Sequence, residues 1–262
     1  MAENNFPNNG KGSSHHRYLK LISGASSGFG KQLSVRLVDR GYNVVISDMN
    51  DKAGKELESL LNKKRPNSAY YLHCDVTKKQ DQEALIKQAV QKYGKLDVMV
   101  NNAGIGENIE FTKNVADNWV KVMDIDLTAV ILGTRLAIDQ FRKQKSGGVV
   151  VSTASLAGLY PVPQQPVYAA AKAGVVNFTK SFAHFKKENI RVNCVCPGFV
   201  KTGITSGNAQ EIMGIKEWIP IEKVIDAFVL GIEDESLGGD VIRITTQYGI
   251  DLPFNKKYKS RL

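Results

Sequence analysis

A regular alternation of short apolar strands and longer helical segments constrains the fold of this chain more than any other feature. The sequence predicts strands at about 18–23, 42–48, 69–75, 96–104, 147–155, 191–197 and 240–246. Helical segments separate them, notably at about 51–64, 118–143 and 167–186. The strand cores read VVI, VMV and VVV, as expected when both faces of a sheet are buried. This pattern predicts an α/β fold with a doubly wound parallel sheet of about seven strands and helices on both faces.

The composition is consistent with one domain. The chain has 262 residues, 42% of them hydrophobic, so it is long enough to bury a core without staples. Residues 1–17 are rich in Asn, Gly and Ser, which predicts a disordered leader. We expect one domain over 18–254, with a short basic tail over 255–262.

The cysteines and the charge distribution indicate where the protein is located and which kinds of partner are unlikely. Cys74, Cys194 and Cys196 have no disulfide-framework spacing, which favours reduced thiols and a cytoplasmic protein. The sequence has no cluster typical of a metal site. The net charge of +9 is spread among acidic residues and the tail, which does not favour a nucleic-acid interface. No apolar run approaches the roughly 20 residues of a membrane span, and the N-terminus does not resemble a secretory signal.

A glycine-rich turn over 23–30, reading SGASSGFG, joins the first strand to a helix. In that context glycines permit a tight turn and close approach of a pyrophosphate to the helix N-terminus. The spacing is GxxxGxG and not the usual GxGxxG, but the strand–turn–helix context predicts a Rossmann-like dinucleotide site. The residues expected to form it are Gly24, Ser26, Ser27, Gly28, Phe29 and Gly30.

The next polar groups follow the ends of later strands. Asp48 ends the second strand, where a carboxylate would bind ribose hydroxyls and repel a 2′-phosphate, favouring NAD over NADP. The alternative is that Asp48 only caps the following helix. Ligands of doubly wound sheets bind at the carboxyl ends of strands. We therefore expect further cofactor contacts from these positions, namely Met49, Asp75, Val76, Asn102, Ala103 and Gly104.

Tyr168 and Lys172 stand four residues apart in an Ala-rich helical run, so their side chains share one helix face. A nearby ammonium favours the phenolate and lowers the tyrosine pKa. Ser155, after a strand, could direct its hydroxyl to the same substrate oxygen. A lone YxxxK motif is most often an ordinary surface pair, so a catalytic role for Tyr168 and Lys172 requires a dinucleotide site around them.

Together, the glycine turn, the Asp75–Val76 pair, NNAG, the Ser155…YxxxK site and the Pro197-Gly198 turn resemble the short-chain dehydrogenase/reductase family over about 18–246. The segments LAGLYPVPQQPVYAAAKAGVVNFT, VCPGFVKT and IEDESLGGDVIRITT are especially similar to NAD-dependent hydroxyprostaglandin dehydrogenases.

The resemblance implies roles for the matching positions. Tyr168 would be the general acid/base, Lys172 would lower its pKa and hold the nicotinamide ribose, and Ser155 would orient the substrate oxygen. Gln165 would bind the substrate, and Asn102 would line the adenosine ribose region. The remaining expected cofactor contacts are Pro197, Val200 and Thr202, the last two at the nicotinamide carboxamide.

Two positions depart from the family pattern. Asp126 stands where many members have an asparagine that holds a water chain to the lysine. Asp126 could pair with Lys172 and weaken its effect on Tyr168, although we expect a tolerated substitution. The segment 203–219, where the family has its substrate lid, looks shorter than in hydroxyprostaglandin dehydrogenases. Its apolar residues could cover a hydrophobic substrate or simply pack on the core: Ile212, Met213, Ile215 and Trp218.

The sequence thus predicts an NAD-dependent oxidoreductase that interconverts a secondary alcohol and a ketone on a small hydrophobic or lipid-like molecule. The alternative is a catalytically weak dinucleotide-binding member that acts as a sensor or interaction protein. The resemblance also implies a homodimer or homotetramer.

Overall fold

A computed structural model describes residues 18–107, 118–203 and 214–255. The predicted leader at 1–17 and most of the tail lie outside these residues, as does much of the segment 203–219. Within the described part, eight strands form one sheet in the order β3-β2-β1-β4-β5-β6-β7-β8. The first seven strands are parallel to their neighbours, and β8 is antiparallel to β7. The doubly wound parallel sheet is confirmed, with one more strand than predicted.

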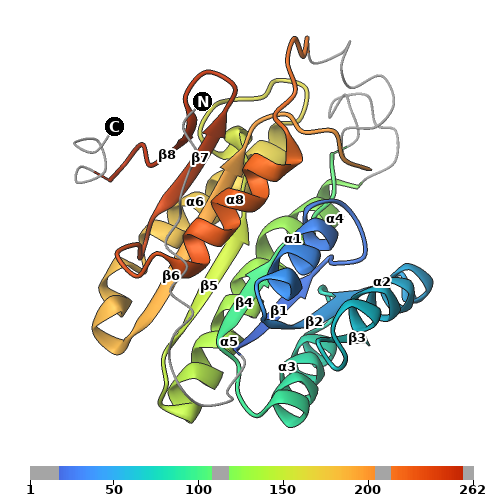
Figure 1. The fold of residues 1–262 in the computed structure, drawn as a ribbon. Coiled ribbons are helices and arrows are strands. Elements are labelled where there is room, and N and C mark those ends of the chain that lie inside the picture. Colours follow the sequence, from blue (N-terminus) through green and yellow to red (C-terminus); the bar gives the residue numbers. More distant parts are fainter. Residues whose placement is uncertain (1–17, 108–117, 204–213, 256–262) are drawn as a thin grey trace, which may run out of the picture.

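The elements alternate along the chain as the apolar pattern predicts (Figure 1). The strands are β1 (Leu19–Ser23), β2 (Asn43–Asp48), β3 (Ala69–His73), β4 (Val98–Asn101), β5 (Gly148–Thr153), β6 (Ile190–Pro197), β7 (Val241–Thr245) and β8 (Gly249–Asp251). The α-helices are α1 (Gly28–Asp39), α2 (Asp51–Lys64), α3 (Lys79–Tyr93), α4 (Trp119–Met123), α5 (Ala129–Gln144), α6 (Pro166–Lys180) and α8 (Ile221–Glu233).

Two long helices predicted from the sequence are interrupted. The segment expected at 118–143 is divided into α4, a π-helical turn over Asp124–Thr128, and α5. The segment expected at 167–186 ends as an α-helix at Lys180, and a 3₁₀ segment, Ala183–Glu188, follows it. The π-helical turn carries Asp126, and such turns are frequent at functional sites.

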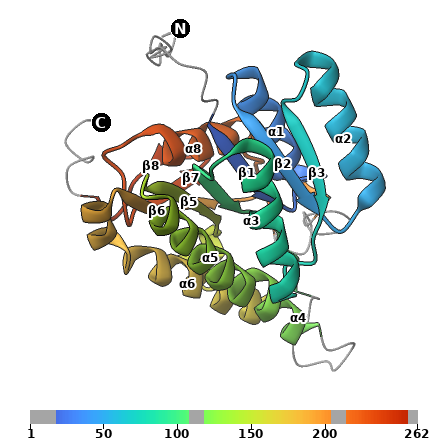
Figure 2. The ribbon, with the colours of Figure 1, turned by 90° about the horizontal axis from the view of Figure 1, so that it is seen from below.

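The hydrophobic core lies on both faces of the sheet (Figure 2). Helices α1, α2 and α8 cover one face, with Leu37 and Phe228 fully buried there. Helices α3, α5 and α6 cover the other, where Phe141 is fully buried. Because both faces are covered, the strand interiors are continuously apolar. No helix in the described part of the chain is long and apolar enough to cross a membrane.

Candidate active site

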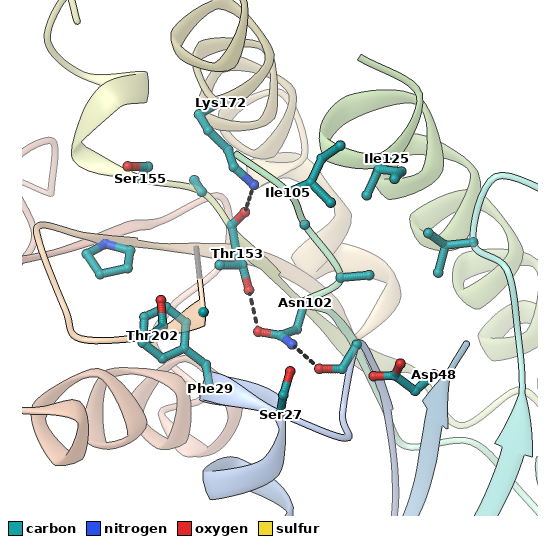
Figure 3. A pocket seen from close by; sticks show the side chains of 18 of the residues that line it. Ser27, Phe29, Asp48, Asn102, Ile105, Ile125, Thr153, Ser155, Lys172 and Thr202 are labelled. Atoms are coloured by element: carbon teal, nitrogen blue, oxygen red, sulfur yellow. Dashed lines mark hydrogen bonds between the residues drawn. The ribbon is translucent and has the colours of Figure 1, made fainter. Parts of the chain in front are cut away.

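The strand order reverses between β1 and β4, and a cavity of about 400 Å³ opens at the carboxyl ends of the strands (Figure 3). Ligands of doubly wound sheets bind at this position. Most of the residues predicted for the site line this cavity: Gly24, Ser27, Gly28, Phe29, Asp48, Met49, Asp75, Val76, Asn102, Ala103, Gly104, Ser155, Tyr168, Lys172, Pro197, Val200 and Thr202.

Four predicted residues lie outside the lining. Ser26 and Gly30 belong to the glycine turn, where the backbone N–H of Ser26 donates to Asp48. Asp126 is fully buried behind Lys172. The side chain of Gln165 donates from Nε2 to the backbone carbonyl of Glu107 at 3.0 Å, an intramolecular contact.

The glycines of the turn permit close packing of the chain at two positions and leave open space at a third. Gly24 has φ +61°, and a Cβ there would meet the Cα of Ala103 at 2.7 Å. A Cβ at Gly30 would meet the carbonyl oxygen of Gly24 at 2.4 Å. At Gly28, φ is +50° and a Cβ would meet nothing within 4 Å, so this glycine faces open space at the N-terminus of α1. These residues therefore fit the pyrophosphate of a dinucleotide.

Asn102 holds the turn against the sheet. Its Nδ2 donates to the carbonyls of Ser23 and Gly24 at 3.0 and 2.9 Å. Its Oδ1 accepts from the hydroxyl of Thr153 at 3.2 Å, as Figure 3 shows. The Asn102 side chain thus links the glycine turn to β5, the strand that precedes Ser155.

Asp48 lies at the end of β2 and lines the cavity. One carboxylate oxygen accepts from the N–H of Ser26 and the other from the N–H of Asn50, each at 3.0 Å. The side chain that caps α2 is Asn50, whose Oδ1 accepts from Ala53. Asp48 is thus not the helix cap, and its carboxylate is fixed between the glycine turn and the β2 end.

Lys172 is the charged centre of the site. Its ammonium lies 2.9 Å from Asp126 Oδ2 and donates to the Thr153 carbonyl at 3.0 Å. Burial is the largest single influence and disfavours the ammonium, but the charge and hydrogen bond of Asp126, together with Tyr168, raise the pKa of Lys172 overall. The other Asp126 oxygen accepts from the N–H of Ile105 at 2.9 Å. The predicted pairing of Asp126 with Lys172 is therefore present.

Tyr168 lies one helical turn before Lys172, whose Nζ is 5.5 Å from the centre of the phenol ring. Burial raises the pKa of Tyr168, Lys172 lowers it, and Asp126 raises it again. Ser155 acts in the lowering direction. The net pKa shift is upward, so the predicted net lowering is wrong for this structure. The reason is that the sequence motif reveals the ammonium but not the depth of burial.

Ser155 lies two residues after the end of β5 and caps a 3₁₀ turn, Leu156–Gly158, where its Oγ accepts from the N–H of Ala157 at 3.1 Å. This contact places the hydroxyl beside Tyr168 at the cavity wall. Ser155, Tyr168 and Lys172 thus converge from β5 and α6 onto one end of the cavity.

Of the four apolar residues considered as a lid, Ile212 and Met213 lie outside the described residues. Ile215 is buried and Trp218 is half-buried, with the ammonium of Lys201 5.7 Å from the Trp218 ring centre.

Thr153, Ile105 and Glu107 are among the contributors to the site that the sequence did not predict. The carbonyl of Thr153 accepts from Lys172, and Ile105 both lines the cavity and donates to Asp126. Glu107 accepts two backbone hydrogen bonds at the start of α6. Backbone contacts cannot be predicted from residue types. The one available signal was Glu107, an acidic residue three positions after the NNAG motif.

Comparisons with known proteins agree with this geometry. The sequence pattern of a family described as short chain dehydrogenase matches residues 19–212. The chain is 36% identical to the 15-hydroxyprostaglandin dehydrogenase [NAD(+)] of Homo sapiens over 253 residues, covering 88% of this chain and 92% of that protein. It is 37% identical to the 3-oxoacyl-[acyl-carrier-protein] reductase of Thermotoga maritima over 190 residues, covering 71% and 75%. The crystal structure of levodione reductase superposes with a TM-score of 0.79 at 27% identity, covering 87% of this chain and 95% of that one.

Proposed function

The chain belongs to the short chain dehydrogenase family, and we propose that it is an NAD-dependent enzyme interconverting a secondary alcohol and a ketone on a hydrophobic, lipid-like substrate. Membership makes it an oxidoreductase acting on CH–OH groups. The observation that carries the proposal is the convergence of Ser155, Tyr168 and Lys172 on the cavity that the glycine turn also lines.

Asp48 supports the preference for NAD. Its carboxylate lines the cavity at the end of β2 and is held by two backbone N–H groups. Such a carboxylate can accept hydrogen bonds from ribose hydroxyls but repels the 2′-phosphate of NADP. The 15-hydroxyprostaglandin dehydrogenases that the chain resembles are named as NAD(+) enzymes.

The dinucleotide would lie between the glycine turn, Asp48 and Lys172, and when bound it supplies hydride transfer. The protein must then transfer one proton to or from the substrate oxygen. In alcohol oxidation, the Tyr168 phenolate accepts the hydroxyl proton, and in ketone reduction the Tyr168 phenol donates it. Lys172 stabilises the phenolate, and Ser155 donates a hydrogen bond to the substrate oxygen. General acid–base catalysis of this kind contributes about 10²–10⁴-fold.

Asp126 has a divided role in this scheme. Its carboxylate keeps the buried Lys172 ammonium charged, and the same negative charge opposes ionisation of Tyr168. This opposition also favours the second candidate, a catalytically weak dinucleotide-binding protein. Turnover with any alcohol or ketone decides between the two.

The proposed substrate class rests on the relatives and on the apolar segment after Thr202. The relatives act, by their names, on a hydroxyprostaglandin and on an acyl chain bound to a carrier protein. Gln165 would reach the substrate after releasing the Glu107 carbonyl. We also propose a cytoplasmic protein, because Cys74, Cys194 and Cys196 are free thiols. We propose a homodimer or homotetramer because Trp119, Val120 and Ile131 are exposed on α4 and α5.

The test is a screen of hydroxylated fatty acids, prostanoids, steroids and their ketones, with NAD and NADP compared side by side by nicotinamide absorbance. We expect turnover with a secondary alcohol and a preference for NAD. Tyr168→Phe should lower kcat by about 10²–10⁴-fold while NADH binding, measured by fluorescence, stays unchanged. Full activity of the Tyr168→Phe variant would contradict the mechanism.

A further inference from the structure

Helix α6 carries the proposed catalytic pair, yet its own sequence does not cap it. The residue before its first turn is Gln165, whose side chain makes no capping hydrogen bond, and Pro166 occupies the first helical position. The backbone N–H groups of Val167 and Tyr168 are the next two donors, and an N-cap side chain normally satisfies such groups. The acceptor for this helix must therefore come from elsewhere in the chain.

Glu107 provides it from 60 residues earlier. Its Oε2 accepts from the N–H of Val167 at 2.8 Å and from the N–H of Tyr168 at 2.9 Å. The connection is reciprocal, because Gln165 Nε2 donates to the backbone carbonyl of Glu107 at 3.0 Å. Three hydrogen bonds thus join Glu107 to the first turn of α6, and one of them is made by the backbone of the proposed acid/base itself.

The segment before Glu107 belongs to the cofactor side of the cavity. Asn102, Gly104 and Ile105 line it, and the N–H of Ile105 donates to Asp126, the partner of Lys172. Residues 102–107 therefore contact the glycine turn at one end and the catalytic helix at the other. Any shift of Glu107 would move the Tyr168 backbone relative to the cofactor side of the site.

The burial of Glu107 argues against an incidental cap. The residue is 6% exposed, and its second oxygen, Oε1, is buried with no hydrogen-bond partner among the described residues. Burying a carboxylate oxygen unpaired costs stability. A shorter neutral residue at the N-cap would satisfy the same donors without that cost. The arrangement is thus unfavourable for stability alone, but it connects two parts of the active site.

We propose that Glu107 is a positioning residue of the dehydrogenase reaction, whose carboxylate fixes the first turn of α6, and with it Tyr168, to the cofactor-lining segment 102–107. The inference rests on the proposed acid/base role of Tyr168. A displacement of about 1 Å in a catalytic group can cost about 10²-fold in rate. The effect should therefore appear in kcat while dinucleotide affinity stays near the wild-type value.

Asn62 supplies a matched control far from the cavity. One side-chain oxygen of Asn62 also accepts two successive backbone N–H groups, those of Ser68 and Ala69, at 2.9 and 3.0 Å. Asn62→Leu and Glu107→Leu each remove two such hydrogen bonds, and Asn62→Leu also removes the one that Asn62 Nδ2 donates to the Ala69 carbonyl at 3.0 Å. Only the second substitution touches α6. Glu107→Gln keeps an oxygen that can accept both bonds, and Glu107→Asp shortens the side chain by one methylene.

The experiment measures kcat, KM, NADH binding and melting temperature for these variants with a substrate from the screen. We expect Glu107→Leu to lower kcat about 10–100-fold, with NADH affinity within about threefold, and Glu107→Gln to recover most of the rate. Asn62→Leu should lower the melting temperature and leave kcat unchanged. The proposal is overturned if Glu107→Leu keeps wild-type kcat, or if Asn62→Leu loses as much.

Two further readouts cover the other outcomes. If Glu107→Leu does not fold, Glu107→Asp should lose activity relative to Glu107→Gln, and equal rates would overturn the proposal. Amide hydrogen exchange in NADH-bound protein should show faster exchange of Val167 and Tyr168 in Glu107→Asp than in Glu107→Gln. This comparison needs no turnover, so a wild-type enzyme inactive on every substrate would contradict the proposed function separately.

Discussion

Two lysines are buried at opposite ends of the same sheet, and their pKa values move in opposite directions. Lys20, in β1 near the amino end, is 5% exposed, and burial lowers its pKa to about 8. Lys172, in α6 at the carboxyl end, is 2% exposed, and its pKa is raised. Burial is nearly the same for both, so burial alone does not decide the direction of the pKa shift. The neighbouring carboxylates decide it.

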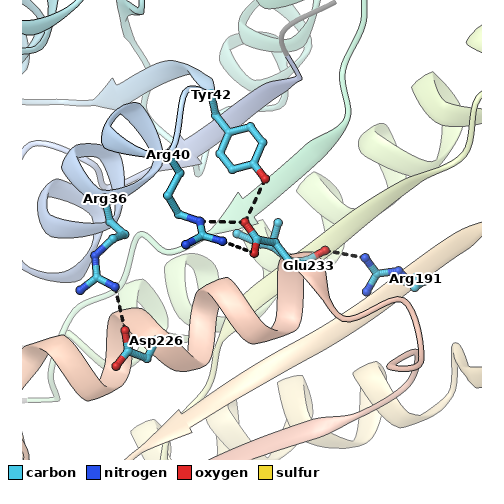
Figure 4. Close-up of polar contacts among 7 residues, drawn as sticks. Arg36, Arg40, Tyr42, Arg191, Asp226 and Glu233 are labelled. Atoms are coloured by element: carbon cyan, nitrogen blue, oxygen red, sulfur yellow. Dashed lines mark hydrogen bonds and ion pairs between the residues drawn. The ribbon is translucent and has the colours of Figure 1, made fainter. Parts of the chain in front are cut away.

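The carboxylates near Lys20 are bonded to other cations. Asp97 lies 2.7 Å from Lys95. Glu233 pairs with Arg40 at 2.6 Å and accepts from the Tyr42 hydroxyl, as Figure 4 shows. The Lys20 ammonium instead lies over the Tyr42 ring, 4.5 Å from its centre. A ring face attracts a cation less strongly than a carboxylate at hydrogen-bonding distance, so burial prevails at Lys20.

Lys172 has the opposite arrangement. Asp126 lies 2.9 Å from its ammonium and is itself fully buried, so the attraction is little screened by solvent. The fold can therefore bury a lysine with its pKa lowered, as at Lys20. The active site adds a buried carboxylate to keep the lysine charged, and it accepts a raised Tyr168 pKa as a consequence.

Removing the functional lysine should have the largest effect. In Lys172→Met, kcat should fall by about 10²–10⁴-fold because Tyr168 loses its cationic neighbour. The unpaired Asp126 should also lower the free energy of unfolding by about 3–5 kcal/mol, measured by urea denaturation. In Lys172→Met/Asp126→Asn the stability should return while kcat stays low. The double variant would contradict this prediction if stability and kcat both recovered, or if neither did, because Asp126 is expected to affect stability and Lys172 to affect catalysis.

Lys20→Met, at the amino end of the sheet, should raise the free energy of unfolding, whereas Lys172→Met lowers it. The Lys20 pKa is about 8 in the folded protein against 10.5 for an unperturbed lysine side chain, so the unfolded chain binds more protons between these values and stability rises with pH across that window. Below pH 8 the buried charge costs about 3 kcal/mol, partly offset by the tyrosine rings. Lys20→Met should therefore be more stable than wild type at pH 7.

The control for Lys20→Met is its pH dependence. The stability advantage should shrink as pH rises from 8 to 10.5, because wild type then loses the buried charge. The value of kcat should stay at that of wild type because Lys20 is remote from the cavity. A variant less stable than wild type at pH 7 would mean that the ring contacts outweigh the cost of burial.

The sequence predicted this molecule best where its signals are local. Strand alternation and the glycine turn depend on neighbouring residue types, so the sheet and the cavity position followed from them. The strand β8 is only three residues long, and the π-helical turn at Asp126 depends on tertiary packing. The Glu107 contacts and the balance of charges at Tyr168 join segments far apart in sequence, and residue patterns do not show burial.

The pairing of Asp126 with Lys172 was an exception. It was predicted because a carboxylate at that position departs from the family pattern, and the structure contains the ion pair. The direction of the Tyr168 pKa shift was predicted wrongly, because burial and Asp126 raise this pKa while Lys172 and Ser155 lower it. The sequence motif identified the groups around Tyr168, but only their positions in the folded protein gave the direction of its pKa shift.

The most direct test of the central claim, that Asp126 keeps Lys172 charged while opposing Tyr168 ionisation, is the pH dependence of kcat for alcohol oxidation in wild type and Asp126→Asn. Removing the carboxylate has two consequences, because Tyr168 loses a charge that raises its pKa and Lys172 loses the partner that offsets its burial. Lys172 acts on Tyr168 more strongly than Asp126 does, so loss of the Lys172 charge should raise the pKa of Tyr168. The acidic limb of the profile should then move to higher pH, and kcat at neutral pH should fall. An acidic limb that stays in place or moves to lower pH would contradict the claim that Asp126 keeps Lys172 charged.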